Sequence, residues 1–591
     1  MIISKPYQFC GYYGYAKDSD LTVLLNEILS DKNIVHKFGF QHGDYVGNVA
    51  YISNSNQELK NLIYFSENEE EKIIASLSAS GFDHQPDAWV KVKNNSLILG
   101  REPFGKVPLY WLKQEDVIWF ASHFQLLLPL LKNPQINIAA LYGYSCFSYI
   151  PNPLSPVKEI FAVPAGTELI WQGKPLEYSS KRLLEWQEAP VLLQDENAAI
   201  SQLQTLLKQA IYRQTQDITS EKVGVFLSGG IDSSVVAALL VQAGIKVTAY
   251  ALDFESILPN PNLSELIYAQ KVADFLGIPL VKVPVTVESI KKAIAPTTLA
   301  LDLPFGDGAP LPLFLLSQVA SQETNIIFNG ENGDQLFAGW TNKPLIAASI
   351  YNREHPEGKK DFNQHYLNTF HALYGYESQI YQRDIYQQIE MINPQDWLEN
   401  ALDSSFTNNI LARLRRASLM LKGAQNIQPR ANNLALSQGL WVRAPFTDLD
   451  LTKWSFQLPG EFCLQGACEK YILKKAVESW LPSEIVWREK QGMAVPVTTL
   501  CLNMLRSEVR KWLSPSRLKK QGIWQPQIAN QIIRGELGGH IRGGRVGRIL
   551  WLLMMWQVWQ SNVLDEVEIN NFTAEIGNFF YDLYYFPPGG K

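Results

Sequence analysis

The stretch VGVFLSGGIDSSVVAALL, residues 223–240, decides the fold of the central part of the chain. An apolar run of strand type leads into a glycine-rich turn, and an apolar run of helical type follows the turn at once. Gly229 and Gly230 lack side chains, so the backbone can approach an anion closely. The N–H groups at the start of the helix would point at that anion, and the helix dipole favours it. The sequence therefore predicts a strand–loop–helix unit that binds phosphate.

This loop carries an acidic residue, which a bare phosphate site would not tolerate. Asp232 fits if it holds Mg²⁺, since that ion bridges polyphosphate oxygens, and the hydroxyls of Ser228 and Ser233 add donors. The chain contains no G-x-x-x-x-G-K-[ST] loop of the kind that serves γ-phosphate transfer. We therefore expect the loop to cradle the β,γ-pyrophosphate while the α-phosphate reacts.

A second polar turn follows another strand-like run in IIFNGENGDQLFAGW, residues 326–340. Asp334 is the candidate second Mg²⁺ ligand, because open α/β sheets bind ligands at the carboxyl ends of their strands. A third stretch, LDLPFGDGAPLPLFLL at 301–316, places Asp302 and Asp307 on a loop before a helix. Turn formation and helix capping are the alternative roles for these acids.

The pattern of apolar residues divides the chain into parts. Residues 1–180 alternate short strand-like runs with turns, which predicts an antiparallel β-rich domain. From 196, strands alternate with helices, which predicts βαβ units and a parallel sheet. The later residues are mainly helical, and ILWLLMMWQVW at 549–559 is expected to be a buried helix. We predict domains at 1–180 and 196–560 and an aromatic tail at 561–591, which would form a surface strap or a substrate lid.

Composition excludes several classes of protein. A chain of 591 residues is too long for one core, so two or three domains are expected. The formal net charge of -6 gives no general attraction to nucleic acid. The five cysteines are scattered without metal-ligand spacing, which favours a reducing compartment. Because the chain has neither a signal-peptide pattern nor an apolar run long enough to cross a bilayer, we expect a cytoplasmic protein without membrane contact.

Several motifs resemble those of the asparagine synthetase family, which includes β-lactam synthetases and the cyclases that close lasso peptides. SGGIDSS, NGENGDQLFAGW, SQGLWVRAPFTDLDL (437–451) and CEKYILKKAVESWLPSEIVWREKQGM (468–493) resemble the synthetase half. REPFGKVPLYW (101–111), FASHFQLLLPLL (120–131) and KEIFAVPAGTEL (158–169) resemble the glutaminase half. The resemblance implies a β-rich Ntn-hydrolase-like α+β domain, then an α/β domain of the adenine nucleotide hydrolase type and a helical C-terminal part.

The resemblance also implies a site. Lys490 falls on the family's catalytic lysine and Arg488 on the arginine before it, while Asp334 and Gln335 complete the predicted catalytic set. The implied cofactors are ATP, with adenine against the strand VTAYAL, and Mg²⁺ on Asp232 and Asp334. The predicted nucleotide-binding residues are Leu227, Ser228, Gly229, Gly230, Asp232, Ser233, Ala251, Gly330 and Glu331.

The positions at which the chain departs from the family pattern also bear on its function. Glutamine-using members have a catalytic cysteine directly after the initiator methionine, because its free α-amine is the general base. Here position 2 is Ile, and nine residues precede Cys10 in FCGYYG. We therefore predict an inactive glutaminase domain. In the synthetase half, Gln335 and Trp441 replace glutamates. The change at Gln335 suggests a nucleophile other than ammonia or a base supplied elsewhere, and Trp441 suggests either a larger substrate pocket or a packing role.

The sequence predicts an ATP-dependent amide ligase that adenylates a small-molecule or peptide carboxylate and couples it to an amine. We favour macrolactam closure of a lasso-type precursor peptide, with that peptide and its leader peptidase as partners. Asparagine formation from aspartate is the alternative, and a non-catalytic ATP-binding pseudo-synthetase is an alternative of another class. The cluster HIRGGRVGR at 540–548 offers Arg542, Arg545 and Arg548 as a solvated loop or as an anion clamp near a helix start.

Overall fold

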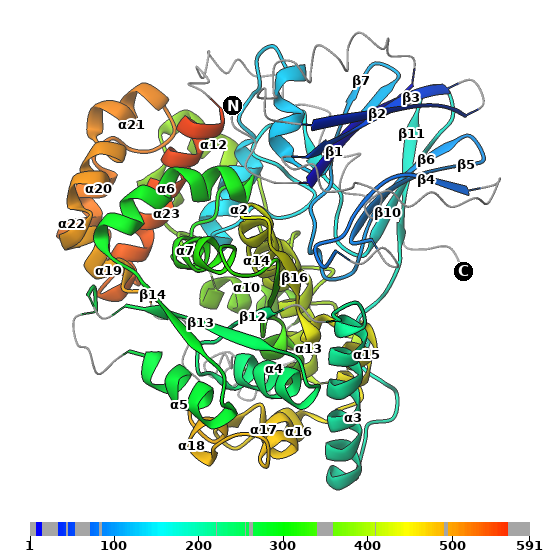
Figure 1. Ribbon diagram of the computed structural model, residues 1–591. Coiled ribbons are helices and arrows are strands. Elements are labelled where there is room, and N and C mark those ends of the chain that lie inside the picture. The colour runs from blue at the N-terminus through cyan, green and yellow to red at the C-terminus, as the bar shows by residue number, and fades with distance from the viewer. Residues whose placement is uncertain are drawn as a thin grey trace.

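The computed structural model has two bodies joined along a broad interface (Figure 1). An antiparallel β-sandwich, in blue and cyan, lies above an α/β body in green and yellow, and the last helices, in orange and red, flank both. The structure describes residues 7–14, 34–42, 45–53, 71–81, 86–219, 222–254, 256–258, 264–339, 358–370, 372–407, 409–489 and 495–564.

The sandwich consists of two antiparallel sheets, with strand orders β2-β3-β1-β8-β7-β9 and β11-β10-β6-β5-β4. Their facing side chains, including Phe9, Val90, Leu99 and Trp111, form one buried core. The prediction of an antiparallel β-rich N-terminal part is confirmed. The strands are β1 Tyr7–Gly14, β2 Ile34–His42, β3 Tyr45–Ser53, β4 Glu71–Leu77, β5 Ala88–Lys93, β6 Ser96–Arg101, β7 Tyr110–Gln114, β8 Val117–Ala121, β9 Phe161–Ala162, β10 Thr167–Gln172 and β11 Glu177–Arg182.

The second body is built on a parallel sheet with strand order β14-β13-β12-β15-β16. Its strands are β12 Val223–Phe226, β13 Val247–Asp253, β14 Leu280–Pro284, β15 Ile326–Phe328 and β16 Trp441–Arg443. Val225 and Ala249 pack into one hydrophobic core, and Tyr250 and Ile327 pack into the other. Helices therefore cover both faces, as the predicted βαβ pattern requires. From β12 the chain forms β13 and β14 on one side, and it then crosses to form β15 and β16 on the other side of β12. The order reverses between β12 and β15, and ligands bind at such a switch point.

Apart from the two-stranded sheet of β17 Leu464–Gln465 and β18 Cys468–Glu469, most of the remaining elements are helices. They are α2 Ile138–Phe147, α3 Glu196–Thr215, α4 Ile231–Gln242, α5 Leu266–Leu276, α6 Val287–Leu301, α7 Pro310–Ala320, α8 Gly333–Phe337, α10 Gly358–Phe370, α11 Glu377–Ile380, α12 Arg383–Ile389, α13 Ile410–Ser418, α14 Gln428–Leu436, α15 Leu449–Ser455, α16 Gly460–Cys463, α17 Tyr471–Val477, α18 Ser483–Val486, α19 Val497–Thr499, α20 Arg506–Trp512, α21 Pro515–Gln521, α22 Ile528–Arg534 and α23 Gly544–Val563. Two short 3-10 turns, η2 Phe124–Leu126 and η8 Pro445–Thr447, and a π-helix, η7 Leu419–Ile427, complete the elements used below.

Helix α23 confirms the prediction of a buried helix at 549–559, since every residue of that run is buried. Its aromatic residues pack on the sandwich side of the interface: Trp559 lies 6.2 Å from Phe124 and Trp556 lies 5.3 Å from Tyr144 between ring centroids. Among the described helices none combines the length and the apolarity that a bilayer crossing requires. The predicted tail falls almost wholly on residues 565–591, which lie outside the described residues.

Asp302 joins the two bodies and does not face the predicted metal site. It ends α6, is fully buried, and accepts hydrogen bonds from the backbone of Phe124 at 2.8 Å and Gln125 at 3.3 Å. His123 Nδ1 lies 2.5 Å from its carboxylate. The sequence placed Asp302 on a loop with Asp307, and of the two roles considered, capping is the one that the structure supports. The capped element belongs to the other domain.

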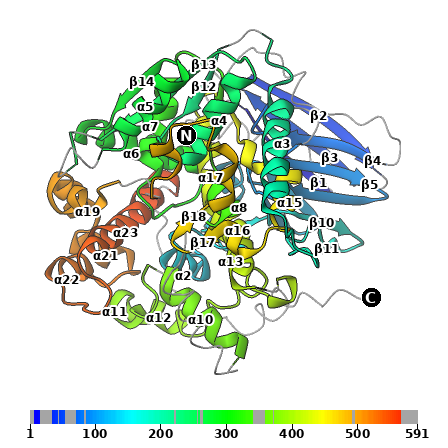
Figure 2. The same ribbon diagram turned by 90° about the horizontal axis from the view of Figure 1, so that it is seen from below.

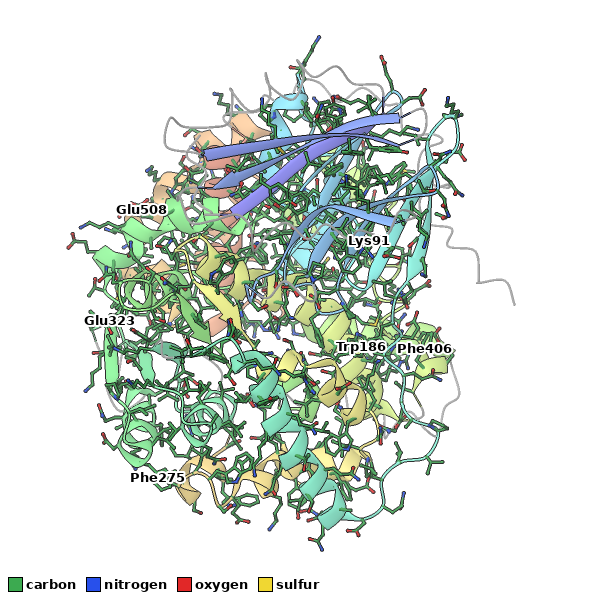
Figure 3. The ribbon with its side chains drawn as sticks, turned by 45° about the vertical axis from the view of Figure 1, so that its right-hand side comes forward. Lys91, Trp186, Phe275, Glu323, Phe406 and Glu508 are labelled. Carbon is green, nitrogen blue, oxygen red and sulfur yellow. The ribbon has the colours of Figure 1, made fainter. Side chains whose placement is uncertain are left out.

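The connector between the bodies is anchored by an aromatic residue. Trp186 is buried, and its carbonyl accepts a hydrogen bond of 2.9 Å from Arg416 Nε. The guanidinium of Arg416 also stacks over Phe406 at 4.2 Å, and Figure 3 shows Trp186 and Phe406 on the same side of the molecule. The connector between β11 and α3 is therefore held in place by the α/β body.

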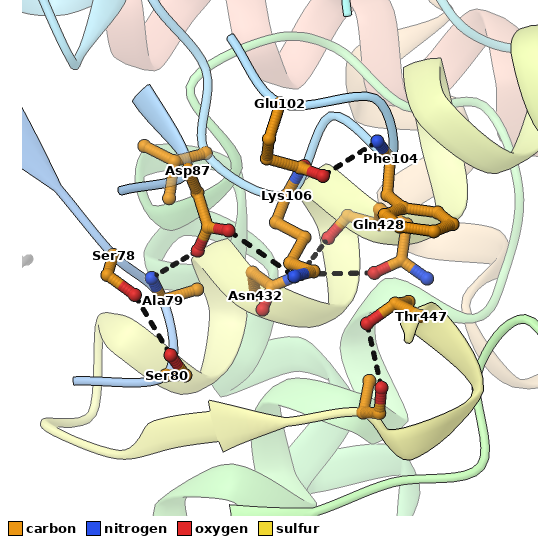
Figure 4. Close-up of polar contacts among 12 residues, drawn as sticks. Ser78, Ala79, Ser80, Asp87, Glu102, Phe104, Lys106, Gln428, Asn432 and Thr447 are labelled. Atoms are coloured by element: carbon orange, nitrogen blue, oxygen red, sulfur yellow. Dashed lines mark hydrogen bonds and ion pairs between the residues drawn. The ribbon is translucent and has the colours of Figure 1, made fainter. Parts of the chain in front are cut away.

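A polar cluster closes the interface beside α14 (Figure 4). Asp87 accepts a hydrogen bond of 2.7 Å from the backbone of Ala79 and pairs with Lys106 Nζ at 3.3 Å, while Gln428 and Asn432 approach from α14. Burial lowers the pKa of Lys106, but the carboxylates of Asp87, Glu102 and Asp448 together more than offset this, so the pKa is raised overall. A charged lysine is thus retained between the two bodies.

Candidate active site

The loop at 227–233 folds back on the start of α4. The backbone N–H of Ser228 donates to Ser233 Oγ at 3.2 Å, and the N–H of Gly230 donates to Ser228 Oγ at 3.2 Å. Gly229 has a φ of +74°, and a side chain there would lie 2.5 Å from the backbone nitrogen of Ala269. Helix α4 has no side-chain cap at its start, so its first N–H groups are left for another acceptor.

The loop after β15 lies directly against this first loop. A Cβ atom on Gly330 would fall 2.6 Å from the backbone nitrogen of Ser233, and one on Gly333 would collide with the carboxylate of Asp232. A side chain on Gly330 would therefore require the backbone to move, and one on Gly333 would displace the carboxylate of Asp232. Their close approach brings Asp232, in the first turn of α4, next to Asp334, in the first turn of α8.

Lys470 bridges the two acidic side chains. Its Nζ forms ion pairs with Asp232 and, at 2.5 Å, with Asp334 Oδ1, and its side chain is only 1% exposed. Lys470 precedes α17 with a φ of +56°, a strained conformation for a residue with a side chain. In Figure 2, α4, α8 and α17 meet in the centre of the view. The ammonium offsets the repulsion between two carboxylates that the fold holds together.

The residues at this point fit a Mg²⁺ ion. Mg²⁺ is commonly held by one or two carboxylates together with substrate phosphates and water, and Asp232 and Asp334 supply such a pair. In the described part of the chain no group of three or more His, Cys, Asp or Glu side chains has a metal-binding arrangement. The phosphates and water would therefore have to complete the coordination.

Arg488 holds the pyrophosphate loop from the outside. Its guanidinium donates to the carbonyl of Gly229 at 3.3 Å, pairs with Glu265 at 2.6 Å and stacks 3.8 Å over the ring of Tyr268. These contacts join the loop, the start of α5 and the segment after α18. The structure gives Arg488 a positioning role within the described residues. Lys490, predicted as the catalytic lysine, lies outside them.

The other predicted nucleotide-binding residues lie near the same sheet edge. Leu227 directly follows β12, and Ala251 is buried near the end of β13, the strand beside it. In the loop after β15, the backbone of Glu331 donates to Asn329 Oδ1 at 3.1 Å. The structure thus brings together the glycines, serines, acids and strand residues that the sequence singled out.

Gln335 is buried behind Asp334 and faces the π-helix η7. Only 3% of the residue is exposed, and a Cβ atom on Gly423 would lie 3.8 Å from its Cγ. Asn332, two residues before Asp334, donates to the carbonyl of Phe446 at 2.7 Å. The acid loop is therefore fixed by packing and hydrogen bonding on both sides.

Trp441 and Arg443 serve the framework. A Cβ atom on Gly81 of the sandwich would lie 2.9 Å from Trp441 Cδ2, so the indole packs across the domain interface. Of the two roles considered for Trp441, the structure supports packing. Arg443 is buried and forms two hydrogen bonds with Asp217, of 2.8 and 2.6 Å.

Cys10 lies in the middle of a strand. It sits within β1, pairs with Ala50 on one side and Ala121 on the other, and is 0% exposed. Burial raises the pKa of its thiol to about 12. Its backbone nitrogen is part of the continuous strand, since Tyr7, Gln8 and Phe9 pair with β3 as well.

Sequence reasoning missed two cationic residues at this site. Lys470 lies within CEKYILKK, which was compared with the family as a segment but not residue by residue. Its position directly before a helix, after a glutamate, was the available signal. Lys422 of η7 lies in a stretch without a recognisable motif, and only the three-dimensional structure places it near Asp334.

An amidotransferase-like sandwich joined to a parallel-sheet domain with a pyrophosphate loop and an acid pair defines an ATP-dependent amide ligase. The family model for asparagine synthase matches residues 202–561, and the model for a glutamine amidotransferase domain matches residues 88–181. The chain therefore belongs to the asparagine synthase family.

Named relatives match over most of the chain. Asparagine synthetase [glutamine-hydrolyzing] 1 of Bacillus subtilis is 22% identical over 79% of this chain and 76% of the relative. A putative asparagine synthetase [glutamine-hydrolyzing] of Mycobacterium bovis is 23% identical over 79% of this chain and 74% of the relative. Asparagine synthetase B [glutamine-hydrolyzing] of Escherichia coli is 20% identical over 74% of this chain and 64% of the relative. The likeness thus extends through both bodies.

Proposed function

We propose that this ligase activates a substrate carboxylate as an acyl-adenylate and passes the acyl group to an amine without hydrolysing glutamine. The observation that carries the proposal is the joining of the pyrophosphate loop to Asp232, Asp334 and Lys470 at the switch point of the parallel sheet. Such an arrangement suits release of pyrophosphate from ATP.

Each residue has a defined part in the reaction. The loop from Ser228 to Ser233 binds the β- and γ-phosphates through backbone N–H groups and hydroxyls. Mg²⁺, held by Asp232 and Asp334, would neutralise polyphosphate charge. The substrate carboxylate attacks the α-phosphorus, the bond to pyrophosphate breaks, and Lys470 stabilises the charge that gathers on the leaving group. An amine then attacks the acyl carbon and displaces AMP, giving the amide.

The position of Cys10 supports an amine source other than glutamine. A glutaminase of this type needs a thiol beside a free α-amine, and Cys10 is buried in mid-strand with a raised pKa. Gln335, buried behind Asp334, cannot accept a proton as a glutamate would. The N-terminal domain then acts as a structural partner of the ligase domain.

Within this reaction we favour macrolactam closure. The side-chain carboxylate of an aspartate or glutamate in a lasso-type precursor peptide would be activated, and the peptide's own α-amine would attack. An intramolecular amine removes the need for ammonia, which agrees with the state of Cys10 and with Gln335. The peptide and its leader peptidase are the partners that this proposal implies.

Asparagine formation from free aspartate and ammonia is the second candidate. Relatives in three bacteria carry the name asparagine synthetase, and that name favours this reaction. The two candidates differ in their acyl donor and in the source of the amine, so they can be separated directly.

The test is ATP–pyrophosphate exchange followed by product analysis. The full chain with ATP and Mg²⁺ is given L-aspartate with ammonium, or a linear peptide with a free α-amine and an internal aspartate. A peptide product lighter by one water supports macrolactam closure, and asparagine supports the second candidate. Cys10→Ala should leave either activity unchanged, whereas Asp334→Asn should lower exchange about 100-fold. Absence of exchange with every carboxylate would mean a binding-only protein.

A further inference from the structure

A charged group beside the acid pair takes no part in the steps above. It consists of Asp307, Lys422, Asn426, Arg430 and Arg548, named here the Asp307 cluster. Arg430 Nη1 donates to Asp307 Oδ2 at 2.8 Å, and Asn426 Nδ2 donates to the same oxygen at 3.3 Å. Asp307, which the sequence placed with Asp302, is therefore the centre of a separate network.

The π-helix places this cluster next to Asp334. Lys422, Asn426 and Arg430 recur every four residues along η7 and the start of α14, so they share one face of the helix. Gly423, the neighbour of Lys422, packs against Gln335, and Gln335 directly follows Asp334. π-Helices are frequent at functional sites because they turn side chains out of the usual register.

Helix α23 closes the cluster from the other side. Trp551 Nε1 donates to the carbonyl of Asp307 at 3.0 Å. Arg548 lies three residues earlier, on the same side of the helix, and is exposed. Of the three arginines in the predicted clamp HIRGGRVGR, Arg548 is the one whose charge acts on Lys422 together with that of Asp307.

The cluster has an excess of positive charge. Arg430 is buried and paired with Asp307, and its Nε has no acceptor among the described residues. Lys422 is exposed, yet enough protein surrounds it that desolvation lowers its pKa; Asp307 and Asp334 oppose this effect, and Arg430 and Arg548 add to it. Two exposed cations, Lys422 and Arg548, thus remain for an anion beside the acid pair.

We propose that the Asp307 cluster binds the carboxylate of the acyl donor before it attacks ATP. The proposal rests on the proposed function. The pyrophosphate loop, Lys470 and the acid pair provide for the phosphates, so the anion that still needs a site next to Asp334 is the donor carboxylate. Adenylation removes the negative charge of that carboxylate, so the cluster contributes more to substrate binding than to the later transition state.

The test measures ATP–pyrophosphate exchange with the donor that the wild-type chain accepts. Lys422→Met and Arg548→Gln should each raise the KM for the donor about tenfold while leaving the KM for ATP within about twofold. Lys422→Arg should restore most of the donor affinity. Arg534→Gln, at an exposed position on α22 outside the cluster, is the control and should leave both constants unchanged.

Each other outcome has a separate meaning. A raised KM for ATP would assign the cluster to phosphate, and unchanged constants in Lys422→Met and Arg548→Gln would remove any anion site; both overturn the inference. If the wild-type chain shows no exchange, the proposed function fails. The cluster is then judged by thermal unfolding: L-aspartate or the linear peptide should raise the Tm of the wild-type chain but not of Lys422→Met, and equal shifts would overturn the inference.

Discussion

Lys470 supplies the positive charge that balances the two carboxylates of this site. Its ammonium lies between Asp232 and Asp334, and its backbone adopts a left-handed conformation to reach them. Non-glycine residues in that conformation cost free energy and persist where the surroundings enforce them. The ammonium offsets the repulsion of the acid pair when no cation is bound and faces polyphosphate when ATP is bound.

Replacing Lys470 with Met should separate these two roles. The acid pair loses its competing cation, so its affinity for free Mg²⁺ in the absence of ATP should rise. The charge on departing pyrophosphate loses its stabilisation, so ATP–pyrophosphate exchange should fall about 100-fold. Calorimetric titration with Mg²⁺ and the exchange assay measure the two effects. Weaker Mg²⁺ binding in Lys470→Met would contradict this account of the ammonium.

Arg488 has a geometry that lysine cannot reproduce. A planar guanidinium stacks on Tyr268 while it bonds to Glu265 and to the carbonyl of Gly229. We expect Arg488→Lys to raise the KM for ATP about tenfold, because the loop loses its brace, with a smaller change in kcat. Tyr268→Leu removes only the stacking surface and should give an intermediate KM. Identical kinetics in the wild-type chain, Arg488→Lys and Tyr268→Leu would show that Arg488 does not support the pyrophosphate loop.

At the scale of elements, the position of Cys10 within strand β1 keeps its thiol buried and protonated. Burial raises the pKa of this thiol from 9.0 to about 12, so at a pH near 9 the folded chain keeps a proton that the unfolded chain releases. The contribution of Cys10 to stability is present below pH 9 and falls as the pH rises toward 12. Its thiolate is accordingly scarce in the folded state.

Iodoacetamide labelling checks this prediction. In the native chain near pH 9, Cys468, which is partly exposed, should react first, and Cys10 should stay unmodified until the chain is unfolded. Peptide mapping after timed labelling locates the modified residues. Rapid native labelling of Cys10 would show that β1 opens and would revive a catalytic role for the thiol.

The strand–loop–helix units of the site were predictable because their signals are local. Apolar runs around Gly229 and Gly230 define β12 and α4, and the glycines of the second loop are needed for its close packing. Lys470 was missed because it is 238 residues from Asp232 in the chain, and no periodicity links residues so far apart. Helix η7 was equally hidden, since neither its π-helical turns nor its position beside Gln335 has a local signal in the sequence.

At the scale of the whole molecule, Asp302 ties the two bodies together. Its carboxylate accepts bonds from the backbone of Phe124 and Gln125 and contacts His123 in a fully buried setting. The sequence could not show this role, because an acid before a polar loop has the same pattern whether it binds a metal or caps another domain. The family resemblance predicted both domains but gave no information on which residues form the interface between them.

Asp302→Ala should loosen the interface and leave the acid pair intact. Removing one partner of a buried, hydrogen-bonded charge costs about 3–5 kcal/mol. We expect a clear fall in the Tm by calorimetry, with separate unfolding transitions for the two bodies, and a nearly unchanged KM for ATP at low temperature. Asp302→Asn keeps an acceptor and should lose less. A raised KM for ATP with an unchanged Tm would place Asp302 in the site.

The edge of the parallel sheet explains why a chain with a buried Cys10 retains its sandwich. Strand β16 ends that sheet, and the backbone of Val442 donates to the carbonyl of Ala79 at 2.7 Å while Trp441 packs on Gly81. Uncovered edge strands invite pairing with other chains. The sandwich therefore covers an edge strand that could otherwise pair with another molecule. We expect the ligase half, when it is expressed alone, to expose this edge and to aggregate.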